Sequence, residues 1–143
     1  MAEVNLDGGC LCGYVRYHIA AESTAILYCH CRMCQRAAGA PVVAWFTIPT
    51  SGLRWLTTKP RVYKSSDAAA RHFCPACGSQ IAFQADAEPE LVDITVASLD
   101  RPAAIVPSYH CWTASQIPWF DTDDTLPRYR HASNEAPATQ EPA

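Results

Sequence analysis

A short turn near the middle of the chain reads Phe73-Cys74-Pro75-Ala76-Cys77-Gly78, and a strand-like run lies on each side of it, at residues 71–73 and 80–83. The Cys-x-x-Cys spacing presents two thiols from one turn. Gly78 can adopt the positive φ that directs backbone N–H groups toward sulfur. Because thiolate sulfur is a preferred ligand of tetrahedral zinc, this turn predicts a zinc knuckle between two strands.

The other cysteines repeat this close spacing. One pair stands at Cys10 and Cys12, a triplet occupies Cys29, Cys31 and Cys34, and Cys111 stands apart. Two pairs together supply the four thiolates of a closed zinc site. The three thiols that remain match a zinc with one position left for water or substrate. The sequence therefore predicts two zinc ions.

The spacing alone leaves several divisions of the cysteines open. The N-terminal pair can join Cys74 and Cys77, in which case the triplet holds a second metal by itself. The triplet can instead take one cysteine of the central turn, which leaves Cys10 and Cys12 without a metal. In a third division, Cys111 or a histidine closes the triplet site, so that both metals are structural.

The main alternative is a disulfide framework, because an even number of cysteines in a small secreted chain usually has that meaning. The first seven residues contain no basic start, apolar run or small-residue cleavage site, so we expect no signal peptide. No apolar stretch approaches about 18 residues, so we expect no membrane partner. These features favour a cytoplasmic protein, in whose reducing surroundings clustered cysteines suit metal better than disulfides.

The composition is that of an ordinary globular protein. Hydrophobic residues make up 49% and charged residues 17% of the 143 residues, a balance that excludes a disordered chain. We expect a single zinc domain at residues 1–130 and a disordered tail at residues 131–143, which is small, polar and proline-bearing. The net charge of −3 gives no basic surface for nucleic acid. The oligomeric state does not follow from the sequence.

The hydrophobic pattern favours strands. Val15, Tyr17 and Ile19 alternate with polar neighbours, and residues 91–97 alternate in the same way. Residues 42–48 are rich in β-branched and aromatic side chains. Eleven prolines oppose long helices, although residues 32–38 can form a short helix or turn. The expected fold is mainly β.

Four segments in order resemble the glutathione-dependent formaldehyde-activating enzyme family, which also includes centromere protein V. They are the runs Gly8–Tyr17, Cys29–Pro41 and Phe73–Gln80, and the closing motif with His110-Cys-Trp, Pro118-Trp-Phe and Asp124-Thr-Leu-Pro127. The similarity runs from about residue 7 to residue 128. It implies an Mss4-like fold of packed antiparallel sheets held by zinc knuckles.

The resemblance also implies which cysteines hold each metal and what the second metal does. Cys10, Cys12, Cys74 and Cys77 would hold a structural zinc. Cys29, Cys31 and Cys34 would hold a second, catalytic-type zinc. The implied activity is that of a carbon–sulfur lyase: the reversible addition of glutathione, or another small thiol, to formaldehyde, which gives S-(hydroxymethyl)glutathione.

Two other functions stay open at this point. The chain can be a non-catalytic binding module stabilised by two structural zinc ions, or a thiol redox protein that uses Cys111. Near the expected second zinc, His30 and His110 are candidates for proton transfer or substrate binding. Arginine side chains suited to glutathione carboxylates are Arg16, Arg32 and Arg36.

Overall fold

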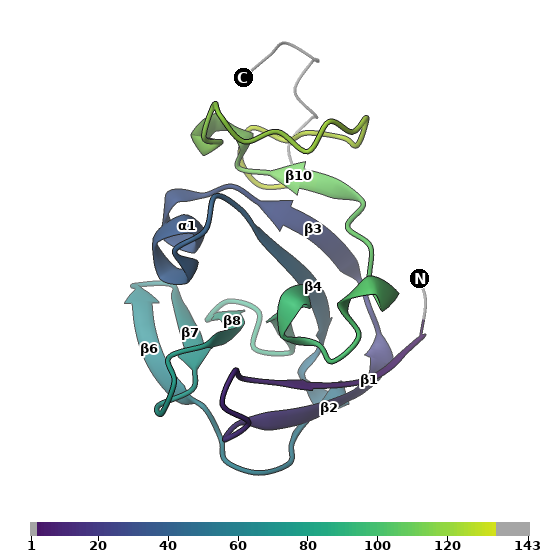
Figure 1. The fold of residues 1–143 in the computed structure, drawn as a ribbon, viewed down its shortest axis with the longest axis vertical. Helices are drawn as coiled ribbons and strands as arrows, with labels where there is room; N and C mark the ends of the chain where they lie inside the picture. Colours follow the sequence, from purple (N-terminus) through teal and green to yellow (C-terminus); the bar gives the residue numbers. More distant parts are fainter. Residues whose placement is uncertain (1–2, 134–143) are drawn as a thin grey trace. The chain divides into compact units, whose positions relative to one another are not determined.

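The structure is a computed structural model that describes residues 3–133 (Figure 1). The described residues fall into two compact units. The first unit combines the residues up to Ala25 with Phe46–Ile105, and the second combines Ile26–Trp45 with the residues from Val106 onward. The expectation of a single domain at 1–130 stays a prediction. Most of the expected tail, from residue 134, lies outside the described residues.

The first unit contains a three-stranded antiparallel sheet in the order β1-β2-β5. Strand β1 is Glu3–Gly9, β2 is Arg16–Glu22 and β5 is Leu53–Trp55. Tyr17 and Ile19, on alternate positions of β2, have no exposed surface, which confirms the period of two seen in the sequence. Opposite Tyr17 the chain needs Gly8, because a Cβ there would lie 2.3 Å from the tyrosine hydroxyl.

The first unit also contains the antiparallel strands around the central turn. Their order is β9-β8-β7-β6, with bounds Leu91–Thr95, Gln80–Ala85, Ala69–Phe73 and Arg61–Ser66. The knuckle joins β7 to β8, as the sequence predicts. Strand β9 stops at Thr95, two residues earlier than expected, and a 3-10 turn, Val96–Ser98, follows it. This turn brings the Ser98 hydroxyl to 2.7 Å from the Tyr17 hydroxyl.

Strand β4, Val43–Pro49, passes from the second unit into the first. Apolar side chains of the first unit that have no exposed surface form its core: Val15, Tyr17, Ile19, Phe46, Ile48, Ile81, Ala82 and Ile94. The described residues also contain three further 3-10 turns, Thr50–Gly52, Pro102–Ala104 and Thr113–Ser115. The expected mainly β class is confirmed. Within residues 3–133, no helix has the length and apolar character needed to cross a membrane.

In the second unit, β3 (Ala25–Cys29) pairs with β10 (Tyr109–Cys111). This pair is parallel, whereas the pairings among β1, β2 and β5 and among β6 to β9 are antiparallel, as the family resemblance implies for the sheets. Its register sets Tyr28 beside His110 and Cys29 beside Cys111. The helix α1, Arg32–Ala38, follows β3 and ends at Gly39, whose φ is 62°. The segment 32–38 is therefore a helix rather than an open turn.

Candidate metal centres

The central knuckle and the N-terminal hairpin bring four cysteines of the first unit together. The sulfur atoms of Cys10, Cys12, Cys74 and Cys77 all lie within 4.8 Å of one another. The Cys10–Cys12 sulfur distance is 3.6 Å and the Cys12–Cys74 distance is 3.8 Å. A tetrahedron with zinc–sulfur bonds of roughly 2.3 Å has edges of about 3.8 Å. The two sulfur–sulfur distances lie close to that edge length, so this donor set fits a tetrahedral zinc ion.

Backbone N–H groups and one serine hold these sulfur atoms in place. The amides of Ala76 and Cys77 lie 3.4 Å from the Cys74 sulfur. Gly78 has the positive φ predicted for it, 80°, and its amide donates to the Cys74 carbonyl at 2.9 Å. Ser79 was not anticipated from the sequence: its hydroxyl lies 3.2 Å from the Cys77 sulfur and accepts the Leu11 amide at 3.0 Å. Ser79 thus ties the knuckle to the loop of Cys10 and Cys12.

Thiols in mutual contact shift one another's pKa in opposite directions. Hydrogen bonds from the side chain and backbone of Ser79 lower the pKa of Cys77 to about 5. A hydrogen bond from the Tyr14 backbone lowers the pKa of Cys12, but contact with the other three cysteines and partial desolvation of the sulfur outweigh it and raise the pKa to about 11. One cysteine of the set is therefore readily ionised, and a divalent cation would stabilise ionisation of the others.

The second unit holds the three-cysteine set. The sulfur atoms of Cys29, Cys31 and Cys34 also lie within 4.8 Å of one another. Cys29 ends β3, Cys31 caps α1, and the Cys34 amide donates to the Cys31 sulfur at 3.2 Å. Cys29 and Cys34 are buried, whereas Cys31 is partly exposed. The set therefore offers three sulfur ligands with one of them at the protein surface.

Cys111 lies beside this set and is 7% exposed. It is the parallel neighbour of Cys29, so both side chains lie on the same face of the β3–β10 pair. Contact with the Cys111 thiol is the main reason why the pKa of Cys29 is raised; contact with Cys31 and burial add to it. Among the described residues, Cys111 is not a member of either tight set. It is a buried thiol in contact with one of the expected zinc ligands.

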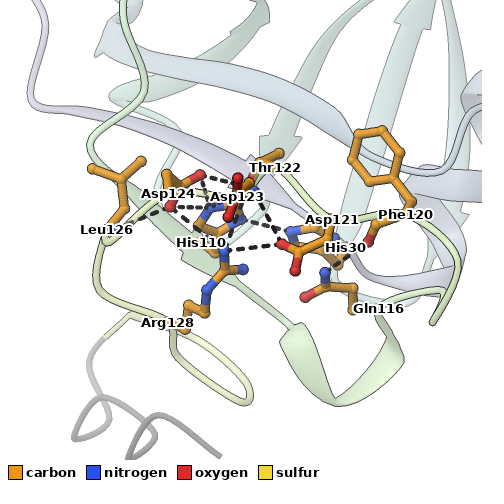
Figure 2. Close-up of polar contacts among 10 residues, drawn as sticks. All are labelled: His30, His110, Gln116, Phe120, Asp121, Thr122, Asp123, Asp124, Leu126 and Arg128. Carbon is orange, nitrogen blue, oxygen red and sulfur yellow. Dashed lines mark hydrogen bonds and ion pairs between the residues drawn. The ribbon is translucent and has the colours of Figure 1, made fainter. Parts of the chain in front are cut away.

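The two candidate histidines, His30 and His110, meet each other in the second unit. The Nε2 of His30 lies 2.8 Å from the Nδ1 of His110, and the Nε2 of His110 lies 3.0 Å from an Asp124 oxygen (Figure 2). Both histidines have no exposed surface. Burial lowers the pKa of His30 to about 4, with the charge of His110 adding to the effect, and burial also lowers the pKa of His110. Both rings are therefore neutral near pH 7.

Asp124 and Thr122 belong to this network. The sequence places Asp124 in the closing motif of the family resemblance, but neither residue was assigned a role from it. The Thr122 hydroxyl donates to Asp124. This bond, together with the contact to His110, holds the pKa of Asp124 at about 2 against the effect of burial, so its carboxylate is charged. The sequence signals for Asp124 were that motif and the acidic run that begins at Asp121, eleven positions after His110.

Two of the three arginines proposed from the sequence as carboxylate clamps, Arg16 and Arg32, have partners within the chain, and the third, Arg36, lies in the last turn of α1. Arg16 forms two parallel hydrogen bonds to Asp100, at 2.8 and 2.5 Å. Arg32 donates to the side-chain oxygen of Gln35 at 2.6 Å. The guanidinium of Arg16 is thus already matched to a carboxylate of the protein itself.

The comparisons with known proteins agree with this geometry. A crystal structure of a Rhodobacter sphaeroides protein is similar to this chain with a TM-score of 0.58 and 25% sequence identity, over 71% of this chain and 98% of that one. The family model described as "Glutathione-dependent formaldehyde-activating enzyme" matches residues 5–115. With both cysteine sets inside the matched region, the chain belongs to the glutathione-dependent formaldehyde-activating enzyme family.

Proposed function

We propose that this protein is a zinc-dependent carbon–sulfur lyase that acts on a small thiol, glutathione in the first instance, and on its adduct with an aldehyde such as S-(hydroxymethyl)glutathione. The observation that carries the proposal is the set Cys29, Cys31 and Cys34, whose three sulfurs lie within 4.8 Å and whose middle member is partly exposed. Three thiolates with surface access suit a zinc ion that accepts a fourth ligand from solution.

The proposed reaction adds a thiol to an aldehyde. The S–H bond breaks, a bond forms between sulfur and the carbonyl carbon, and the carbonyl oxygen gains the proton; the lyase direction is the reverse. Zinc bound at the three cysteines would lower the pKa of the incoming thiol and so supply a thiolate at neutral pH. Cys29 and Cys34 fix the buried side of this site, and partly exposed Cys31 lies at its open side.

The four-cysteine set has a structural role in this proposal. Cys10 and Cys12 follow β1, whereas Cys74 and Cys77 connect β7 and β8, so a shared zinc ion cross-links two hairpins that are distant in sequence. Four protein thiolates leave no position for a substrate. We therefore place the chemistry at the second set.

One observation favours a second candidate, a non-catalytic module with two structural zinc ions. Cys111 contacts Cys29 on the same face of the β3–β10 pair, so it is the nearest candidate for a fourth thiolate ligand of the second zinc. Such a site would bind no external thiol. Burial of Cys111 weighs against the third candidate, a redox thiol, because oxidants react with accessible thiolates.

Zinc X-ray absorption and thiol titration separate these candidates. For the protein with two zinc ions, the lyase proposal predicts an average of about 3.5 sulfur ligands per zinc before glutathione is added and about 4 afterwards. Calorimetry should show binding of glutathione and none of S-methylglutathione, which has no thiol. The protein should also speed the equilibration of glutathione with formaldehyde, and Cys31→Ser should remove this effect. Four sulfur ligands per zinc before addition, with no heat from glutathione, would establish the structural module instead.

A further inference from the structure

A chain of buried hydrogen bonds runs from the surface of the second unit to the residue between two expected zinc ligands. Asp124 is charged, so it accepts a hydrogen from the Nε2 of His110. His110 is neutral and then has an unprotonated Nδ1, which accepts from the Nε2 of His30 at 2.8 Å. Asp124 thus fixes the tautomers of both rings. Within the described part of the protein, the Nδ1 of His30 has no hydrogen-bond partner.

The parallel register shows on which face of strands β3 and β10 the hydrogen bonds from Asp124 to His30 lie. Side chains alternate between the two faces of a strand, so Cys29 and Cys111 share one face while Tyr28 and His110 share the other. The ring of His110 stacks on Tyr28 with a centroid distance of 4.8 Å and on His30 with a distance of 5.0 Å. His30 therefore lies on the face away from the Cys29 sulfur. This arrangement favours a positioning role over direct contact with a thiol bound at the metal.

His30 is held at three points. Its amide donates to the Cys111 carbonyl at 3.1 Å, and its carbonyl accepts from the Gln35 side chain at 2.8 Å. The same Gln35 nitrogen lies 3.1 Å from the Ser115 carbonyl. The ring bond to His110 is the third point. Because His30 stands directly between Cys29 and Cys31, these anchors fix the relative directions in which the two sulfur atoms project.

We propose that Asp124 and His110 are positioning residues for the second metal site: through the ring of His30 they hold Cys29 and Cys31 in the arrangement that binds zinc. The inference rests on the proposed zinc at Cys29, Cys31 and Cys34. Three thiolates repel one another. The zinc affinity therefore depends on how closely the metal-free protein already holds the three sulfur atoms in the arrangement that binds zinc. Hydrogen bonds around metal ligands commonly affect metal affinity in this way.

The test measures zinc affinity at both sites of the full-length, two-zinc protein by titration with a chromogenic chelator. The variant Asp124→Asn keeps the size of the side chain and removes its charge. The matched control is Asp121→Asn, because Asp121 pairs with Arg128 as Asp124 does, at 3.5 Å. Within residues 3–133, Asp121 acts on His110 through its charge and forms no hydrogen bond with it. Asp124→Glu restores a carboxylate. The four-cysteine site, in the first unit, is the internal reference.

We expect Asp124→Asn to weaken zinc binding at the three-cysteine site by about 10-fold or more, within the 10- to 100-fold range typical of residues behind metal ligands. The four-cysteine site should change less than about twofold, Asp121→Asn should match the wild type at both sites, and Asp124→Glu should recover part of the loss. Long-range ¹H–¹⁵N spectra of the histidine rings should show that Asp124→Asn alone changes the His110 and His30 tautomers.

Each other result overturns the inference. An unchanged zinc affinity of the three-cysteine site in Asp124→Asn would show that the hydrogen bonds from Asp124 to His30 do not position the sulfur atoms. Equal weakening at both sites shows a general loss of stability, and equal loss in Asp121→Asn shows an effect of net charge. If Asp124→Asn fails to fold, Thr122→Val, which removes the hydroxyl that donates to Asp124, takes its place with the same comparison. A wild-type protein that binds zinc only at the four-cysteine site refutes the proposed function itself and the inference with it.

Discussion

Replacing Cys12 by serine tests how much a zinc ion at the four-cysteine set, as we propose it, contributes to folding. Cys12 is exposed, so the substitution removes no packed side chain, unlike a change at fully buried Cys74. Its sulfur lies 3.6 Å from Cys10 and 3.8 Å from Cys74, and these contacts link the N-terminal hairpin to the knuckle. Serine oxygen is a poor replacement for thiolate as a zinc ligand. The variant therefore changes the protein almost entirely through the metal.

The size of the effect follows from the separation of the ligands along the chain. Cys12 and Cys74 stand 62 positions apart, and a cross-link of that span removes about 4 kcal/mol of chain entropy from the unfolded state by the relation used for disulfides. We expect Cys12→Ser to lower the free energy of unfolding by about 4 kcal/mol, with the roughly 10 kcal/mol of a structural zinc as an upper bound. Typical domains have only about 5–15 kcal/mol in total.

Urea unfolding followed by tryptophan fluorescence, with the zinc content measured on the same samples, tests this prediction. Leu11→Ser is the matched control: Leu11 is 88% exposed, stands between the two ligands, and should change neither zinc content nor stability. In excess chelator, wild type and Cys12→Ser should unfold alike, because both have lost the cross-link. The reasoning is wrong if Cys12→Ser keeps two zinc ions and wild-type stability, or if its instability persists between the two metal-free proteins.

Three further predictions concern buried groups. Burial raises the pKa of Asp93 from 3.8 to about 6. Between these two values the folded protein keeps a proton on Asp93 that the unfolded chain releases, so the free energy of unfolding should fall as the pH rises from about 4 to 6. Asp93→Asn should raise the free energy of unfolding at pH 7 by up to about 3 kcal/mol and flatten that pH dependence; equal slopes in both proteins would contradict this. Gly8→Ala, whose Cβ would lie 2.3 Å from the Tyr17 hydroxyl, should cost about 1–3 kcal/mol in the same unfolding assay, whereas no loss would show that Tyr17 moves freely. Cys111 is only 7% exposed, so in the zinc-loaded protein it should be alkylated far more slowly than a thiol of the unfolded chain. Mass spectrometry measures the rate, and rapid labelling would exclude both burial of Cys111 and its ligation to metal.

The sequence predicts local features of this fold well. Gly78 has the positive φ expected of it, and the Cys74 turn joins two strands at the expected places. Tyr17 and its alternating neighbours are buried as the period of two indicates. In each case the deciding interactions lie within about ten residues, so side-chain type and spacing alone carry the information.

The sequence does not predict features whose partners are distant along the chain. The parallel pairing of β10 with β3 joins residues about eighty positions apart, and nothing in the short run Tyr109–Cys111 indicates its direction. The bond between His30 and His110 depends on that pairing. The role of Ser79 depends on the approach of the Leu11 loop from the other hairpin. Spacing rules cannot detect such contacts, because the register that creates them is a property of the folded sheet.

The two cysteine sets differ in the same respect, and this difference is consistent with the structural role proposed for one and the catalytic role proposed for the other. The four-cysteine set forms only when two distant hairpins meet, so any metal it binds stabilises the folded state directly. The three-cysteine set lies within six residues and needs no distant ligand. Its geometry must therefore come from groups that are not ligands: the cap at Cys31, the neighbouring strand β10, and the hydrogen bonds that reach His30 from Asp124. Because these groups support the sulfur atoms without binding the metal, the proposed fourth ligand position stays available to a substrate thiol.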